Sequence, residues 1–195
     1  MADKDKGSFF RWLSKPESMV GLSAVLISIV AVGVSAYEAS LIRSSQHAAA
    51  WPNIQLNRSM FYSDGENGER IWTLTFNAEN VGVGPALIKD FKVTVDGEAY
   101  PTWGAAIKTL DEDADGLAYG QSSINGTTVP VGRTVQMFQI RHPTLARELY
   151  DAMDSLDFKA CYCSIFGDCW TASYQAEQSA TPVKTCKPSE DSFTE

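Results

Sequence analysis

The sequence predicts a mainly β protein: one N-terminal transmembrane helix, then an antiparallel β-sandwich with one or two short helices. Three observations predict it. An uncharged run extends from Met19 to Ala36, many short alternating segments with turn residues between them follow, and these segments show no βαβ rhythm. The chain beyond Ala50 has about 145 residues, which suits one domain with its own core.

The run from Met19 to Ala36, MVGLSAVLISIVAVGVSA, is the predicted membrane span. As a helix its 18 residues rise roughly 27 Å, close to the hydrocarbon thickness of a bilayer, and the helix can continue beyond Tyr37. We therefore predict four parts: a cytoplasmic basic segment at 1–18, the span and its juxtamembrane extension at 19–50, an extracytoplasmic β-sandwich at 51–175 and a polar tail at 176–195.

The charges that flank the span predict its orientation. Four basic residues precede it and only Arg43 follows it closely; the four are Lys4, Lys6, Arg11 and Lys15. Because Lys and Arg are retained on the cytoplasmic side, we expect an inner-membrane protein with a cytoplasmic N-terminus and a periplasmic or extracellular domain. The alternative is a cleaved signal peptide, since Val34–Ala36 offers small residues at a cleavage site. The apolar run is longer than a typical signal sequence, which favours the anchor.

Alternating apolar and β-branched residues predict the strands in order. They are expected around Ile54–Tyr62, Ile71–Phe76, Leu87–Val95, Arg133–Arg141, Asp157–Phe166 and Cys169–Tyr174. The dipeptides Asp96-Gly97 and Asn125-Gly126 suit the positive φ values of tight hairpin turns.

Two helices are predicted within the domain. Trp103–Leu110 forms a short one, and in residues 143–156 Leu145, Leu149 and Met153 recur every four residues beside polar positions. The tail that follows residue 175 is polar and is predicted to be largely disordered beyond Cys186.

The four cysteines lie late in the chain, at Cys161, Cys163, Cys169 and Cys186. An even number in an exported domain indicates disulfides. If the flanking strands form a hairpin, Cys163 and Cys169 lie opposite each other and Cys161 is left for Cys186. Four cysteines allow three pairings, which sequence alone does not decide. A zinc or iron–sulfur site is the alternative, although the spacings match none of the usual ligand pairs.

An acidic stretch after the first short helix, DEDADG, opens like a calcium loop. Asp111, Asp113 and Asp115 offer oxygens at alternate positions, but the twelfth position, where a bidentate Glu is expected, is Ser122. Weak calcium binding and a solvated acidic loop are therefore both open.

The composition speaks against several functions. The chain has a net charge of −8 and a sequence pI of about 4.8, without a basic stripe after the span, so nucleic acid is not an expected partner. His47 and His142 are the two histidines, and no nucleophile elbow or paired-histidine motif accompanies them. We expect His142 to be a helix-capping or surface residue and predict no catalytic residue, although residues far apart in a sequence can still assemble an active site.

The segment from Asn80 to Ala86, NVGVGPA, lies between two predicted strands. Two glycines and Pro85 indicate a bulge or a crossing between sheets. The stretch LTFNAENVGVGPALIKDFKVTVDGEAY resembles a pattern of bacterial immunoglobulin-like modules. With the span and the CYCSIFGDCW ending, the chain is similar over residues 50–175 to uncharacterised bacterial envelope proteins that have one anchor and one small β domain. The resemblance implies an extracytoplasmic immunoglobulin-like sandwich and no catalytic residues.

These features predict a non-catalytic interaction protein or accessory subunit of an envelope complex, held in the lipid bilayer by Met19–Ala36. A homo-oligomer is an open possibility, because Ala24 and Ser28 are small residues four apart in the span. The alternative is a module that binds a small ligand or calcium.

Overall fold

The computed structural model describes residues 16–111, 114, 116, 118–176 and 180–194. By its contacts the chain divides into two units between Gln46 and His47. The first unit holds most of a long helix and the second holds both β-sheets, and each is described by itself.

The long helix α2 (Pro16–Ala49) contains, among the described residues, the one segment long and apolar enough to cross a membrane, Met19–Ala49. Its 31 residues rise about 46 Å. This exceeds the roughly 30 Å of hydrocarbon in a bilayer, so a part of the segment is sufficient to cross. Serine hydroxyls in the helix donate to carbonyls of the preceding turn, as Ser28 does to Ala24 at 2.8 Å, so they need no partner in lipid.

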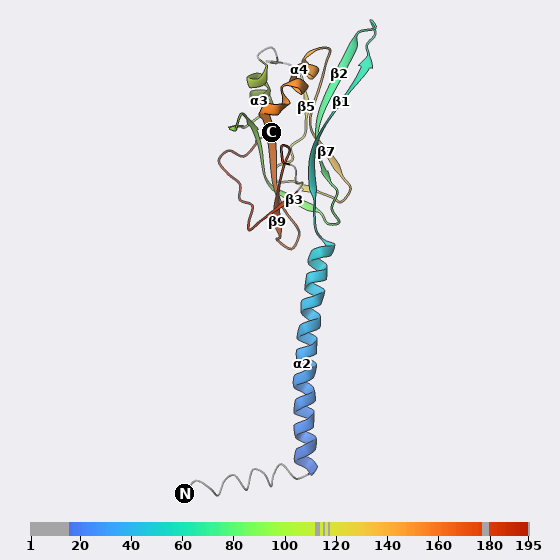
Figure 1. The fold of residues 1–195 in the computed structure, drawn as a ribbon, viewed down its shortest axis with the longest axis vertical. Coiled ribbons are helices and arrows are strands. Elements are labelled where there is room, and N and C mark those ends of the chain that lie inside the picture. Colours follow the sequence, from blue (N-terminus) through green and yellow to red (C-terminus); the bar gives the residue numbers. More distant parts are fainter. Residues whose placement is uncertain (1–15, 112–113, 115, 117, 177–179, 195) are drawn as a thin grey trace. The chain divides into compact units, whose positions relative to one another are not determined.

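The second unit consists of two antiparallel sheets with short helices (Figure 1). Sheet A has the order β1-β2-β7-β5, and sheet B has the order β10-β9-β8-β3-β4 with β6 also paired to β3. The strands of sheet A are β1 (Ile54–Asp64), β2 (Arg70–Asn80), β5 (Gly120–Gln121) and β7 (Thr134–His142). Those of sheet B are β3 (Ala86–Val95), β4 (Glu98–Tyr100), β6 (Thr128–Val129), β8 (Leu156–Cys163), β9 (Cys169–Ser173) and β10 (Thr181–Val183). The helical elements are α3 (Trp103–Leu110), α4 (Leu145–Asp151) and the 3₁₀ turn η2 (Met153–Ser155).

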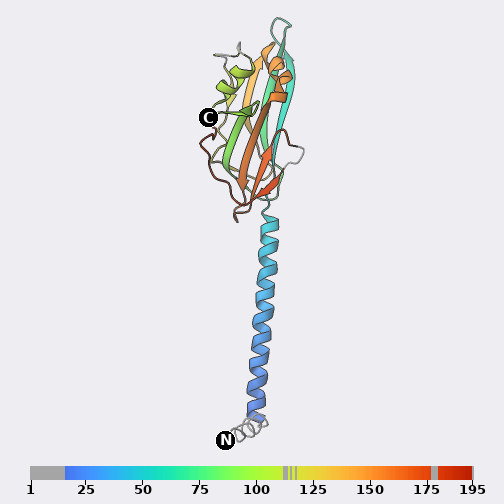
Figure 2. The ribbon, with the colours of Figure 1, turned by 60° about the vertical axis from the view of Figure 1, so that its left-hand side comes forward.

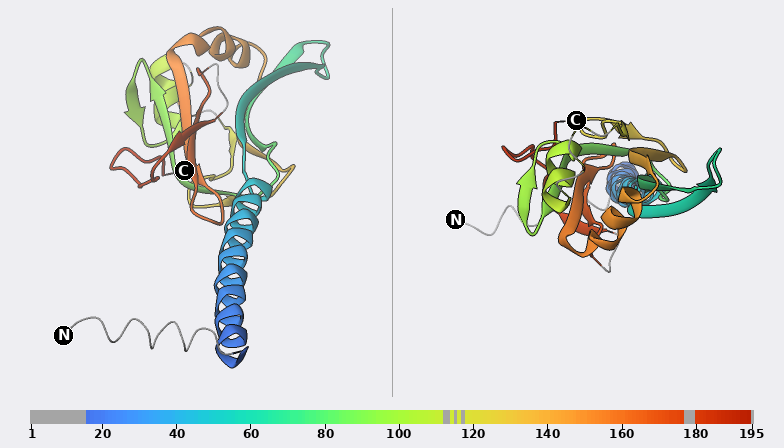
Figure 3. Two further views of the ribbon diagram at one scale, coloured as in Figure 1. Left: turned by 60° about the horizontal axis from the view of Figure 1, so that its bottom comes forward. Right: turned by 90° about the horizontal axis from the view of Figure 1, so that it is seen from above.

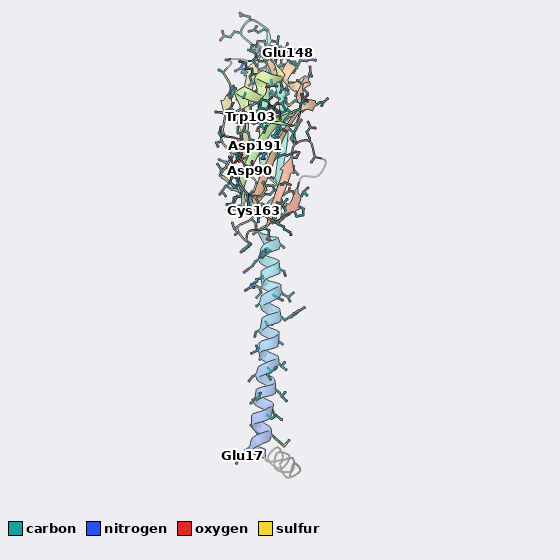
Figure 4. All side chains as sticks on the ribbon, turned by 90° about the vertical axis from the view of Figure 1, so that its left-hand side faces the viewer. Glu17, Asp90, Trp103, Glu148, Cys163 and Asp191 are labelled. Carbon is teal, nitrogen blue, oxygen red and sulfur yellow. A yellow bond between two sulfur atoms is a disulfide. The ribbon has the colours of Figure 1, made fainter. Side chains whose placement is uncertain are left out.

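Figure 2 shows the strands of the domain from a second side. Aromatic side chains join the two sheets into one core. Phe76 of β2 lies with its ring centroid 5.3 Å from Phe158 of β8, across the space between the sheets. Trp103, the first residue of α3, is 1% exposed and lies 5.3 Å from Phe138 of β7 and 6.3 Å from Phe158 (Figure 4). The core is therefore closed by a helix residue that contacts both sheets.

Two sequence predictions about local structure are confirmed. α3 spans Trp103–Leu110 as expected, and the Thr102 hydroxyl caps it by accepting from the Ala105 N–H at 3.2 Å. Asp96 and Gly97 both adopt positive φ in the turn that joins β3 to β4. Such a turn matches the twist of the flanking strands.

One other local prediction is wrong, and one is confirmed in part. Gly126 does form a turn, with φ of 71°, but β5 before it pairs with β7 and β6 after it pairs with β3. The turn therefore crosses from one sheet to the other instead of closing a hairpin. The helix predicted over residues 143–156 is shorter: α4 ends at Asp151 and η2 follows it, since the chain must straighten into β8 at Leu156.

The segment NVGVGPA is held by the buried side chain of Asn80. Its Oδ1 accepts from the N–H groups of Asn53 and Gly82, at 3.2 and 3.1 Å. Its Nδ2 donates to the carbonyls of Gly84 and Val129, both at 2.9 Å. One amide thus joins the chain entry, the β2–β3 connection and the end of β6, which accounts for the crossing that the glycines and Pro85 indicated.

The two glycines of this segment are required by space. A Cβ on Gly84 would lie 2.1 Å from the Ala50 carbonyl oxygen, and one on Gly82 would lie 2.4 Å from the Asn53 nitrogen. Both contacts are with backbone atoms, which cannot rotate away. Residues 50–53 and 82–84 therefore run in direct backbone contact.

The prediction of a disordered tail beyond Cys186 is wrong for the described residues. Phe193 is 2% exposed, and its ring lies 5.2 Å from Trp103 and 5.6 Å from Phe91. Its N–H donates to the Phe91 carbonyl at 2.8 Å, and Asp90 accepts from the Ser192 hydroxyl. The tail is polar in composition, but it contains one aromatic residue, Phe193, whose side chain completes the core.

We predict that Gly84→Ala lowers the free energy of unfolding by about 3 kcal/mol, because the added methyl group must displace the backbone at Ala50. Gly120→Ala is the matched control, since its Cβ would meet nothing closer than 3.9 Å. Urea titration of the full chain in detergent, followed by tryptophan fluorescence, measures both. Equal stability of the two variants would contradict the contact.

Replacement of Phe193 by Ala is expected to cost about 3 kcal/mol, because it opens a cavity beside Trp103. Phe61→Ala serves as the comparison, since Phe61 is 53% exposed and its loss should change stability by less than about 0.5 kcal/mol. The same urea titration applies. If the tail did not complete the core, Phe193→Ala and Phe61→Ala would have the same free energy of unfolding.

Candidate interaction surface

Of the three residues proposed for calcium, the structure describes only Asp111. Asp111 follows α3 as its C-cap, and its N–H donates to the Ile107 carbonyl at 2.9 Å. Asp113 and Asp115 lie outside the residues that the structure describes. The calcium hypothesis therefore stays a prediction from the sequence.

The four cysteines form the two disulfides expected from the hairpin, Cys163–Cys169 and Cys161–Cys186. The first joins directly opposite residues of β8 and β9, and the second ties the chain after β10 to β8. The sulfurs of Cys163, Cys169 and Cys186 lie within 4.8 Å of one another, a spacing that could hold a metal. Because every cysteine is in a disulfide, no thiolate remains, and the alternative of a thiolate metal site is wrong for this structure.

His142 acts as a helix cap, which is one of the two roles expected for it. Its Nδ1 accepts from the Leu145 N–H at 3.0 Å, at the start of α4, where Thr144 makes no side-chain cap. His47 lies with Nδ1 2.5 Å from the Asp168 carboxylate and its ring against Phe166. Each histidine therefore has a structural contact of its own.

The surface that stands out is the outer part of the β1–β2 hairpin, residues 58–76, which we call the hairpin arm. β1 is the edge strand of sheet A and pairs with β2 over eleven positions, from Ile54–Asn80 to Asp64–Arg70. β7 supports β2 only as far as Trp72, opposite His142. Figure 1 and the left view of Figure 3 agree that the turn of the hairpin stands apart from the other elements of the domain.

Aromatic and arginine side chains alternate along the core-facing side of the hairpin arm. The Tyr62 ring lies 5.2 Å from Trp72, its neighbour on β2. The guanidinium of Arg70 lies 4.7 Å from the centre of the Tyr62 ring, and that of Arg147, from α4, lies 5.4 Å from Trp72. The opposite side of the arm exposes Phe61, which like Tyr62 is 53% exposed.

The inner end of the hairpin arm is fixed by Arg58. Its guanidinium lies 4.0 Å from the centre of the Tyr150 ring and 5.8 Å from that of Tyr174, and it donates to the Tyr150 carbonyl at 3.4 Å. Tyr174 stacks on the core residue Phe158 at 4.5 Å. Burial raises the pKa of Tyr174 above its ordinary value, while the positive charge of Arg58 acts in the opposite direction. The arm is thus attached to the core through one cation between two rings.

The arginines of the hairpin arm face rings instead of carboxylates. Among the described residues none of Arg58, Arg70 and Arg147 is in an ion pair. Exposed arginine, tyrosine and tryptophan are the residues that most often contribute to binding energy at protein interfaces. A long edge strand also offers unpaired N–H and C=O groups to an added strand. The arrangement can bind an extended segment of another protein and pair with carboxylates on it.

Sequence reasoning identified the strand that contains Tyr62 but not this surface. The signal was present as two alternating triplets, Arg58-Met60-Tyr62 and Arg70-Trp72-Leu74, on both sides of a turn. Alternation alone does not tell a covered face from an exposed one. β7 ends at His142, opposite Trp72, so the hairpin lacks a third strand only beyond Trp72, toward its turn.

No known protein family matches the chain, and no curated protein matches it.

We expect Arg58→Gln to raise the pKa of Tyr174 further, because the cation that favours its phenolate is removed. Absorbance titration at alkaline pH measures the change, with Tyr174→Phe to assign the signal. Arg58→Lys is the control, since it keeps the charge and should leave the pKa closer to that of the unchanged chain.

The sign of the stability effect follows from the raised pKa. The contribution of neutral Tyr174 is complete below the ordinary tyrosine pKa of about 10 and is lost as the pH rises through the higher folded value. Tyr174→Phe should therefore lose less stability than the unchanged chain above pH of about 10. Parallel pH profiles for the two proteins would contradict the assignment.

Proposed function

We propose that this protein is a non-catalytic, membrane-anchored interaction protein or accessory subunit of an envelope complex. The apolar segment Met19–Ala49 supports the anchor. The basic residues before it and the two disulfides support a cytoplasmic N-terminus with an immunoglobulin-like domain in the periplasm or outside the cell.

The hairpin arm is the observation on which the proposal rests. It combines an edge strand, two half-exposed aromatic side chains on opposite sides and arginines without carboxylate partners among the described residues. A monomeric domain gains no stability from a half-exposed Phe61, and long bare edges favour unwanted association. A partner that covers both the edge strand and Phe61 would account for their presence in one surface.

The partner that this surface suits is a protein with an extended segment that bears carboxylates. Strand addition along β1 would supply main-chain hydrogen bonds, and the alternating pattern would set the register. Arg70 and Arg147 would then each contact a ring and a carboxylate at once. Arg58 already fixes the inner end of the hairpin arm, so little conformational entropy is lost when a partner binds.

The test is a photo-crosslinking pull-down of the full chain from native membranes, with a benzophenone amino acid at Ser59, an exposed position on β1. We expect an adduct with one partner that is lost in Phe61→Ser, because the central aromatic contact is removed. Phe166→Ser is the matched control, since Phe166 is 45% exposed but lies in the β8–β9 turn.

Replacement of Met19–Ala36 by an unrelated span should leave the adduct unchanged, since the hairpin arm carries the recognition. An adduct that Phe61→Ser does not reduce, or that both serine variants lose equally, would contradict the proposal. An adduct with a second copy of the chain would show that the protein forms a homo-oligomer and is not an accessory subunit.

A further inference from the structure

The exposed apolar side chains of the domain are not scattered over its surface. Among the described residues from Ala50 onward, eight large apolar side chains are exposed, and Phe61 and Tyr62 of the hairpin arm account for two. The other six lie in four connecting segments, and we call them the apolar rim: Trp51, Val81, Val83, Val131, Ile165 and Phe166. Their exposed fractions range from 40% at Trp51 to 61% at Val83.

Hydrogen bonds place the segments of the apolar rim at one end of the domain. The N–H of Val83 donates to the Trp51 carbonyl at 2.9 Å, and the N–H of Gly132, next to Val131, donates to the Asn80 carbonyl at 2.8 Å. The β8–β9 turn follows Cys163, which lies opposite Leu87 at the start of β3. The four segments therefore surround the point at which the chain enters the domain.

The charge of this end differs from that of the rest of the domain. Residues 47–195 contain 11 Lys and Arg against 20 Asp and Glu, a net charge of −9. The four segments (50–53, 80–86, 130–133 and 164–168) contain only Arg133 and Asp168, a net charge of zero. The Asp168 carboxylate is already in contact with His47, and Arg133 is exposed.

The covalent chain fixes what lies near this end. Trp51 is the second residue after Ala49, the last residue of the candidate span, and two residues reach about 7 Å at most. Counted from Ala36, the last residue of the uncharged run, the 13 helical residues that follow rise about 20 Å. Once this run is inserted, Trp51 therefore stays within about 27 Å of the bilayer surface. The chain itself thus keeps this end of the domain within reach of the membrane that holds the span.

We propose that the apolar rim inserts into the interfacial layer of the membrane that holds the span. Tryptophan and phenylalanine favour this layer because their rings combine apolar area with a tolerance for the polar boundary. Arg133 reaches a lipid phosphate, and the acidic remainder of the domain stays in water. This inference concerns a surface other than the hairpin arm and rests on the span being a membrane anchor.

The segments of the apolar rim are ordered before any contact with lipid. Asn80 holds Val81 and Val83 through the bonds to Gly82 and Gly84, and the Cys163–Cys169 disulfide closes the turn that carries Ile165 and Phe166. Insertion then costs little conformational entropy. Anchored at both the span and the rim, the domain would hold a fixed height and direction above the bilayer.

The experiment uses the full chain in phosphatidylcholine nanodiscs at one chain per disc. An environment-sensitive fluorophore is attached to an added cysteine without reductant, so that the disulfides persist. The site tested is Val131→Cys, with Glu66→Cys in the turn of the hairpin arm as the exposed control and Val30→Cys as the marker of an inserted span. Phosphatidylcholine that carries a spin label high on its acyl chain quenches fluorophores in the interfacial layer.

We expect several-fold stronger quenching at Val131→Cys than at Glu66→Cys. Adding Ile165→Ser and Phe166→Ser to the labelled chain should remove most of the quenching at position 131, whereas adding Phe61→Ser should leave it unchanged. This result would support insertion of the rim, independently of whether the hairpin arm binds a partner.

Three results would overturn the inference. Quenching at Val30→Cys without quenching at Val131→Cys would show that the domain stands clear of the lipid. Absence of quenching at both positions would show that the span is not inserted. A fluorophore at position 131 that is shielded only when two chains share a disc would assign the rim to a second copy.

Discussion

The buried amide of Asn80 is the interaction on which most of the architecture depends. Its four hydrogen bonds join the chain entry, the β2–β3 connection and the end of β6. Since the side chain is fully buried, no water can take the place of a lost partner, and each unpaired group would cost roughly 1 to 3 kcal/mol. The same amide bonds to both of the segments that meet at the close backbone contact between Gly84 and Ala50.

Features with a local cause could be predicted from the sequence. The α3 helix, the Asp96-Gly97 turn and the pairing of Cys163 with Cys169 depend on residues close together in the chain. Features with a distant cause could not be predicted. Phe193 is buried because it packs against Phe91 and Trp103, which lie far from it in the sequence. The Asn125-Gly126 turn crosses between the sheets because the strand before it pairs with β7 and the strand after it pairs with β3. The hairpin arm belongs to the second group.

The two exposed apolar surfaces of the domain differ in chemistry. The hairpin arm places Tyr62 and Trp72 among arginines, which suits a specific polar and aromatic partner. The apolar rim surrounds Val83 and Phe166 with uncharged backbone and few polar groups, which suits a partner without fixed hydrogen-bonding sites. One domain can in this way keep recognition and attachment on separate parts of its surface.

The position of β3 in sheet B has a consequence for the order in which the domain forms during synthesis. β3 pairs along most of its length with β8, which follows only after α3, β7 and α4 have been made. Until then β3 has only the short strands β4 and β6 beside it, and the edge that β8 covers in the finished sheet stays unpaired. Such non-local pairing slows folding and leaves one strand edge of β3 open to association until β8 has formed.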